Sequence, residues 1–257
     1  HDYGTSGLER FYPAAHVVSE RRQVALSHFA YFPGTALTGA AWGVLPSPLD
    51  DYRLLVLLAT AGLFGVALLF RAPVEWRIAA GAALAANPLA VRGAWFGTAD
   101  AVSLLCVLLA FALATRSRLA GAAAALAVAV LLKQFALAAV PFVAVTLLVL
   151  GATRRELWRA GAVFAAIVVV GFLPFLVADP GSVWRDTVSY GSGTYRIIGY
   201  GLAALLERAG IVHGRTGSYP FDVLALVVWL PATAWAVRAA LRSREPWTCA
   251  AGLAGSF

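Results

Sequence analysis

Long apolar stretches separated by short polar segments run through most of this chain. They cover residues 54–70, 78–89, 94–114, 119–132, 135–150, 160–177 and 221–237, and another begins at residue 248. Their apolar content is typical of transmembrane helices, although 78–89 and 119–132 are shorter than the roughly 17 residues of a full span. Short helices leave backbone groups that must be buried in protein or line a wet cavity. We therefore predict an all-α, polytopic transmembrane helix bundle with a site at the membrane boundary.

Lys133, the only lysine of the chain, interrupts the apolar run from 119 to 150. A single helix over this run would be about 48 Å long, which exceeds a hydrocarbon core of about 30 Å. Two short helices that meet at Lys133 fit better, and they place the lysine at the tip of a hairpin at a membrane surface. There a cation can meet an anionic substrate, although a snorkelling lysine without a role is the alternative.

Arginines cluster in four short segments, which lie within 71–77, 116–118, 154–159 and 238–244. Such loops face the cytoplasm under the positive-inside rule. If all four clusters lie inside, the chain must cross the membrane twice between successive arginine clusters. The apolar stretches allow two crossings each time. With Glu245, which directly follows the last segment, the four segments hold ten arginines and three glutamates, so the whole formal net charge of +7 falls on the proposed inner side.

The proposed outer side then receives residues 1–53, a turn at 90–93, the Lys133 tip and the stretch 179–220. The apolar segment 29–45 has no full crossing left to it in this topology, so we interpret it as a re-entrant or interfacial helix. An ordinary transmembrane helix is the alternative. Aromatic residues fall near the outer boundary, as in an interfacial belt: Trp95, Trp184, Tyr195, Tyr200 and Tyr219.

Composition supports an integral membrane protein. Hydrophobic residues make up 61% of the chain, charged residues make up 13%, and the mean hydropathy is +0.78. A soluble domain carries about 25% charged residues. The arginines are spread over short loops rather than along one face, which argues against nucleic acid as a partner. The chain begins at His1 and contains no methionine, so we expect elements to be missing before His1. It ends inside an apolar segment, so we also expect elements to be missing after Phe257.

Three carboxylates outside the arginine segments are candidate site residues, namely Asp2, Asp100 and Asp186. Asp100 follows a turn and heads an apolar helix, so it could instead cap that helix. Asp2 could belong to a disordered terminus, and Asp186 could be a solvated loop residue.

The cations assigned to the outer side include Lys133, Arg185 and Arg196, and headgroup contacts are the alternative for the arginines. A carboxylate near several cations at a membrane surface suits transfer from a lipid-linked phosphate donor. The leaving phosphate needs positive charge, and the acceptor hydroxyl needs an ionised base. The cysteines and histidines show no metal-ligand spacing.

The order of these features resembles the GT-C superfamily of polytopic glycosyltransferases. In that superfamily an acidic residue lies in the first outer loop, where His1-Asp2-Tyr3 stands here. An aromatic-Pro-Pro-Leu stretch often follows, and Tyr31-Phe32-Pro33-Gly34 matches it in position, with one proline fewer and Gly34 in place of leucine. Asp100 at the head of a helix, Lys133-Gln134 and the long stretch near 179–200 resemble later parts.

This resemblance implies an inverting membrane glycosyltransferase, mannosyltransferase-like, with or without a divalent cation. The donor would be a polyprenyl-phosphate sugar, and the acceptor a glycolipid or cell-envelope glycan on the extracytoplasmic side of the cell membrane. Asp2 would be the base and Asp100 a second acidic group. The substrate-binding residues would be Lys133, Gln134, Arg185, Arg196 and Tyr31.

The domain organisation that we expect is one transmembrane module over 1–257. Its parts are a first outer loop (1–53), helical hairpins (54–178), a second outer loop (179–220) and C-terminal helices (221–257), with juxtamembrane helices in the two outer loops. A polytopic transporter is the main alternative function. We find no internal repeat, and most charges fall near the boundaries rather than at mid-membrane, where transporters bind substrate. A non-enzymatic assembly subunit is a further alternative.

Overall fold

The computed structural model describes residues 31–70, 72–86, 88–185, 187, 208–210 and 221–245. The chain divides into two compact units. One comprises His1–Tyr31 with Ala178–Asp222, and the other comprises Phe32–Val177 with Val223–Phe257. The described part is helical and contains no strand, as the apolar pattern predicts.

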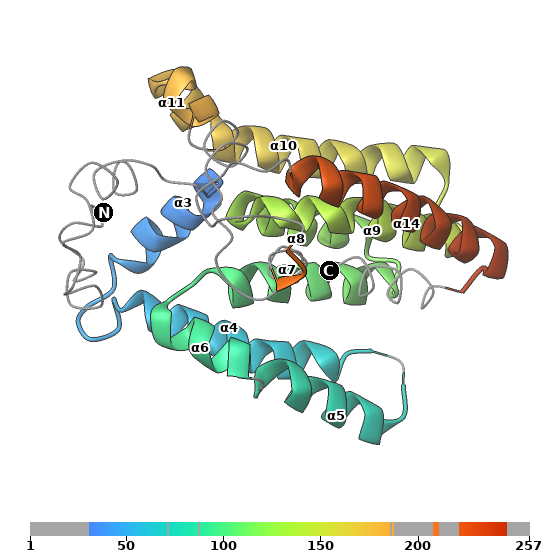
Figure 1. The fold of residues 1–257 in the computed structure, drawn as a ribbon, viewed down its shortest axis with the longest axis horizontal. Coiled ribbons are helices and arrows are strands. Elements are labelled where there is room, and N and C mark those ends of the chain that lie inside the picture. The colour runs from blue at the N-terminus through green and yellow to red at the C-terminus, as the bar shows by residue number, and fades with distance from the viewer. Residues whose placement is uncertain are drawn as a thin grey trace. The chain divides into compact units, whose positions relative to one another are not determined.

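The larger unit contains most of the helices (Figure 1). They are α3 (Pro33–Trp42), α4 (Tyr52–Ala67), α5 (Val74–Ala85), α6 (Pro88–Phe96), α7 (Asp100–Ala114), α8 (Leu119–Leu132), the 3-10 helix η1 (Gln134–Ala139), α9 (Val140–Val149), α10 (Arg154–Ala178) and α14 (Phe221–Ser243). The last residue of α10 and the first two of α14 belong to the smaller unit, which also contains α11 (Pro180–Trp184).

The core is built around the antiparallel pair α7 and α8. The buried Ser103 hydroxyl near the start of α7 donates to the Ala129 carbonyl near the end of α8, at 3.0 Å. Small residues let the two helices approach closely, since Ala110, Ala122 and Ala129 are fully buried between them and their neighbours. Transmembrane helices pack in this way because lipid provides no hydrophobic driving force between them. Small side chains let the backbones approach and gain van der Waals contact.

The helix is interrupted at Lys133, as predicted from the length of the apolar run. The α8 helix ends at Leu132, and Lys133 is extended, with φ −148° and ψ 127°. The second half starts as the 3-10 helix η1 and becomes the α-helix α9 only at Val140. Position 133 therefore lies in a true interruption between two short helices.

The predicted turn at 90–93 is wrong, because these residues lie inside α6. Pro88 is the first residue of that helix, a position where proline's missing N–H and fixed φ are favourable. The helix ends at Gly97, whose φ is +68°. The N–H groups of Gly97 and Thr98 donate to the carbonyls of Ala94 and Gly93, which is a Schellman motif. The turn is thus later than predicted, and Asp100 begins α7.

The arginine segments adjoin helix ends at one end of the larger unit. In Figure 1, α4, α7, α9 and α14 finish at the right-hand end, where α5, α8 and α10 begin. The Arg77 and Arg116 guanidiniums donate to the consecutive carbonyls of Leu68 and Leu69, at 2.9 and 2.8 Å. Cations are favourable beside such carbonyls at a helix C-terminus. Several arginines predicted in loops instead lie in the terminal turns of α5, α10 and α14.

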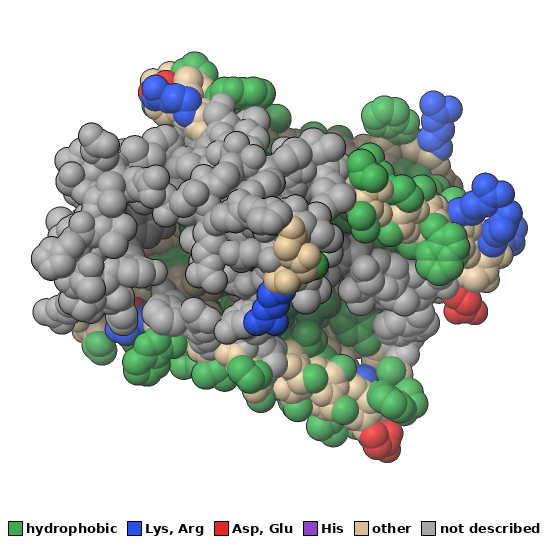
Figure 2. Space-filling view, viewed as in Figure 1, with side chains coloured by type: hydrophobic (Ala, Val, Ile, Leu, Met, Phe, Trp, Pro, Cys, Tyr) green, Lys and Arg blue, Asp and Glu red, His purple; other side chains and the backbone are tan. Residues whose placement is uncertain are grey.

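Apolar side chains cover much of the outer surface of the described helices. Figure 2 shows hydrophobic side chains on the face in view, together with lysine or arginine side chains at its right-hand end. Exposed large hydrophobic residues occur on α4, α5, α6, α10 and α14, among them Leu57, Ile78, Val91, Val170 and Val228. Among the described helices, α10 alone is long and apolar enough to cross a membrane by length and composition, and four shorter helices are apolar.

The helix α3 contains 10 residues, so it is about 15 Å long. This is about half of a hydrocarbon core, and α3 cannot cross one by itself. The full-span alternative for segment 29–45 therefore does not describe α3, and its interfacial position stays a prediction.

Gly97→Ala tests the placement of Asp100. An alanine with positive φ is strained by about 1–2 kcal/mol, so we expect a lower melting temperature in detergent. The matched control is Gly65→Ala, since a Cβ added at position 65 meets nothing within 4 Å. Because Gly65 is inside α4, alanine there should raise stability by up to about 1 kcal/mol. Equal effects of the two substitutions would contradict the role given to Gly97.

Candidate functional site

An ion pair joins the two helices at the end of the larger unit opposite the arginines. Lys133 Nζ lies 2.8 Å from Asp100 Oδ1. Asp100 is the first residue of α7, and Lys133 directly follows α8, so the antiparallel packing of these helices brings the two side chains together. Both were predicted as site residues, and the structure places them in direct contact.

The two partners differ sharply in exposure. The Lys133 side chain is 10% exposed, whereas that of Asp100 is 53% exposed. Removing an ammonium from water is costly unless an opposite charge or hydrogen bonds compensate. Asp100 provides that charge, and the Phe135 ring lies 5.9 Å from Lys133 Nζ, within the range of a cation–π contact. Lys133 is therefore a buried, compensated cation and not a snorkelling one.

Asp100 does not cap α7, which was the alternative role. The N-cap residue is Ala99, and it makes no side-chain capping hydrogen bond. The Asp100 carboxylate lies in the first helical turn, where the macrodipole favours negative charge, and it is directed to Lys133.

Hydroxyl groups that the sequence analysis missed lie on the elements next to this pair. Thr35 Oγ1 donates to the Leu132 carbonyl at 2.6 Å, immediately before Lys133. Thr38 Oγ1 lies 3.5 Å from the Tyr52 hydroxyl, and Tyr52 is within electrostatic reach of Lys133. The only signal in the sequence was the pair of threonines inside the apolar segment 29–45. The site therefore combines a cation, a carboxylate and several hydroxyls from α3, α4, α7 and the end of α8.

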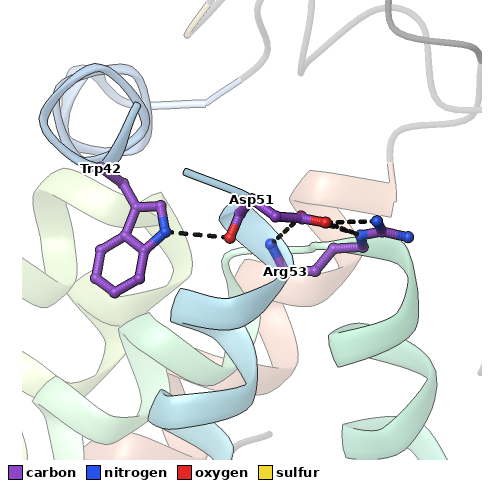
Figure 3. A network of polar contacts seen from close by, with 3 residues as sticks. All are labelled: Trp42, Asp51 and Arg53. Carbon is purple, nitrogen blue, oxygen red and sulfur yellow. Dashed lines mark hydrogen bonds and ion pairs between the residues drawn. The ribbon is translucent and has the colours of Figure 1, made fainter. Parts of the chain in front are cut away.

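A second polar network closes the connection between α3 and α4 (Figure 3). Trp42 Nε1 donates to the Asp51 carbonyl at 3.1 Å. The Asp51 carboxylate caps α4 by accepting from the Arg53 N–H, and it also accepts from the Arg53 guanidinium. This hydrogen bonding from Arg53 is the main reason that the pKa of Asp51 lies below its ordinary value of 3.8.

Of the remaining predicted site residues that the structure describes, only Gln134 belongs with the ion pair to the larger unit. Gln134 follows Lys133 and begins η1. Tyr31 and Arg185 belong to the smaller unit, where Arg185 Nη2 donates to the Ser182 hydroxyl at 2.6 Å. Asp2, Asp186 and Arg196 lie outside the described residues.

No cluster of three or more His, Cys, Asp or Glu side chains that could hold a metal ion occurs in the part of the chain that the structure describes. The ion pair supplies a carboxylate as a base or ligand and an ammonium for an anion. These groups are suited to transfer chemistry on a phosphate-linked substrate.

In the part of the chain that the structure describes, helices with exposed apolar side chains hold an ion pair with a buried lysine at one end, which is the character of a membrane enzyme. The model of glycosyltransferase family 87 matches residues 29–257, and the chain belongs to this family. It is a membrane family of the GT-C type, so the resemblance stated from the sequence is confirmed, and the chain is a glycosyltransferase. No curated protein and no solved structure matches the chain.

Asp51→Asn tests the charge at the start of α4 without removing the cap, because asparagine is an equally good N-cap residue. The pair is exposed, so we expect a loss of less than about 1 kcal/mol at pH 7. A lowered carboxyl pKa stabilises the fold above the unfolded-state pKa, and this stabilisation is lost as the pH falls.

The difference between wild type and Asp51→Asn should therefore shrink as the pH falls through 4 towards 3, which thermal unfolding in detergent can measure. A difference that grows on acidification would contradict the assignment.

Proposed function

We propose that the protein transfers a sugar from a polyprenyl-phosphate donor to a glycolipid or cell-envelope glycan on the extracytoplasmic side of the membrane. Membership of the glycosyltransferase family supports the reaction class. The donor, the acceptor and the side of the membrane are our inference from the ion pair and the distribution of charge.

The observation that carries this proposal is the position of the Lys133–Asp100 pair. The pair lies at one end of the bundle. At the opposite end, arginine guanidiniums donate to the carbonyls of Leu68 and Leu69. If the arginine end faces the cytoplasm, as the positive-inside rule predicts, the pair faces outside. A lipid-linked sugar could present its phosphate at this level, because the polyprenyl chain stays in the bilayer while the phosphate stays in the headgroup region.

In this proposal Lys133 binds the donor phosphate. The carbon–oxygen bond between the sugar and the phosphate breaks, and negative charge accumulates on the departing phosphate. A buried ammonium stabilises this charge more strongly than a solvated one, because little water screens it. The half-exposed carboxylate of Asp100 gives the site an open side, from which a phosphate can approach the lysine.

The other roles follow the family resemblance. Asp2 is proposed as the base that takes the proton of the acceptor hydroxyl as the new glycosidic bond forms. Arg196 joins Lys133 at the phosphate, while Gln134, Arg185 and Tyr31 contribute to substrate binding. A divalent cation could assist the leaving phosphate, since such ions commonly neutralise transferred phosphates.

The multi-pass topology is supported by the exposed surface. Apolar side chains are exposed on α4, α5, α6, α10 and α14, as expected of helices that face lipid. Exposed tryptophans occur near both ends of the larger unit, with Trp76 and Trp158 beside arginines and Trp95 beside the turn at Gly97. Tryptophan prefers the two membrane–water interfaces, which agrees with several crossings.

Lys133→Ala should lower transfer from a radiolabelled polyprenyl-phosphate sugar by about 100-fold or more in kcat/KM, because an electrostatic contact to the leaving group is lost. The assay uses the full-length protein in membranes. The matched control is Arg53→Gln, which removes an exposed cation near α3 and should change kcat/KM by less than about twofold. Asp2→Asn removes the proposed base and should abolish transfer. Transfer that persists in both the Lys133→Ala and the Asp2→Asn variants would contradict this mechanism.

Asp100→Asn tests whether Asp100 affects donor binding or the chemical step. The ammonium would lose its competing carboxylate, so the donor KM should stay equal or fall, while kcat falls by about tenfold or more if Asp100 assists the reaction. An increase in donor KM would contradict the idea that Asp100 and phosphate share Lys133. Uptake of the labelled sugar without transfer would instead favour a transporter.

A further inference from the structure

We propose that Thr35 is a positioning residue for Lys133. It acts through the Leu132 carbonyl and fixes the chain at the end of α8, so that the lysine is held towards Asp100. The consequence for donor binding rests on the function proposed above, but the positioning itself does not.

The first support is the close approach of α3 to α8. Gly34 is buried, and a Cβ at this position would lie 2.5 Å from the Leu131 carbonyl carbon and 2.8 Å from the Leu131 Cβ. Real Cβ atoms do not approach backbone so closely, so only glycine permits this contact. This explains why Gly34 stands where the related motif often has leucine. The first turn of α3 is thereby docked directly on the last turn of α8.

The second support is the carbonyl that Thr35 binds. The last carbonyls of a helix have no partner within the helix and must be satisfied elsewhere. Leu132 is the last residue of α8, and its carbonyl accepts from Thr35 Oγ1 at 2.6 Å. This carbonyl belongs to the peptide unit that leads into Lys133. Its orientation sets the direction in which the extended Lys133 leaves the helix.

The third support is that α3 is held along its whole length. Near its middle, Thr38 Oγ1 lies 3.5 Å from the Tyr52 hydroxyl, and at its end Trp42 Nε1 donates to the Asp51 carbonyl. The helix α3 is therefore held against the end of α8 and the start of α4.

Lys133 offers a direct chemical readout, because it is the only lysine of the 257 residues. We would measure its rate of acetylation by an amine-reactive ester in the full-length protein in detergent, with the modified peptide quantified by mass spectrometry. Thr35→Val keeps the shape and removes the hydroxyl. It should increase the rate by about tenfold, the change expected when one partly buried hydrogen bond no longer opposes local opening.

Two controls separate positioning from general destabilisation. Thr35→Ser keeps a hydroxyl and should restore the wild-type rate. Thr146→Val removes a buried hydroxyl that bonds only to Phe142 in its own helix, and it should leave Lys133 labelling unchanged even if the melting temperature falls. If Thr35→Val does not fold, Thr35→Ala replaces it with the same expected increase. Unchanged Lys133 labelling in the folded Thr35 variant would overturn the inference, whatever the transfer assay shows.

The kinetic consequence is tested separately. Thr35→Val should raise the donor KM more than the acceptor KM, because only the donor phosphate meets Lys133, and Thr35→Ser should reverse the change. Faster labelling without any transfer by wild type would contradict the proposed function while it supports the role of Thr35. The labelling and transfer assays thus distinguish a failure of the role given to Thr35 from a failure of the proposed function.

Discussion

The charge of Lys133 is the constraint on which the arrangement of this protein depends. An ammonium that is largely withdrawn from water needs a nearby carboxylate, and Asp100 provides it at 2.8 Å. The pair forms only if α7 begins where α8 ends, so it requires the antiparallel packing seen between Ser103 and Ala129. At the same position the chain leaves helical geometry, since Lys133 is extended with φ −148° and ψ 127°.

Polar chemistry is concentrated at opposite ends of an apolar bundle. At one end, arginines donate to helix C-terminal carbonyls. At the other end, hydroxyls, a carboxylate and one buried cation gather where α3 docks. The reaction that we propose would bring a water-soluble sugar and a lipid-bound phosphate to the same place. A site at the rim of a helical bundle satisfies both requirements, because the lipid chain can stay in the bilayer.

Much of this fold follows from length and pattern, and the site follows only in part. The break at Lys133 was predictable because the apolar run is too long for one span. The turn after α6 was misplaced because it was taken from the gap between two apolar stretches, whereas the left-handed conformation that ends the helix is at Gly97. The contact of Lys133 with Asp100 depends on helix packing, which local pattern does not specify. Thr35 and Gly34 went unrecognised for the same reason, since their roles come from the approach of α3 to α8.

The most direct test is to determine which side of the membrane each end of the bundle faces. Single cysteines would replace Asp100 and Arg116 in turn, in a background without Cys106 and Cys249, and intact right-side-out vesicles would be treated with a membrane-impermeant maleimide. The account predicts that position 100 reacts in intact vesicles and that position 116 reacts only after permeabilisation. Reaction of position 116 from outside, with position 100 protected until permeabilisation, would contradict it.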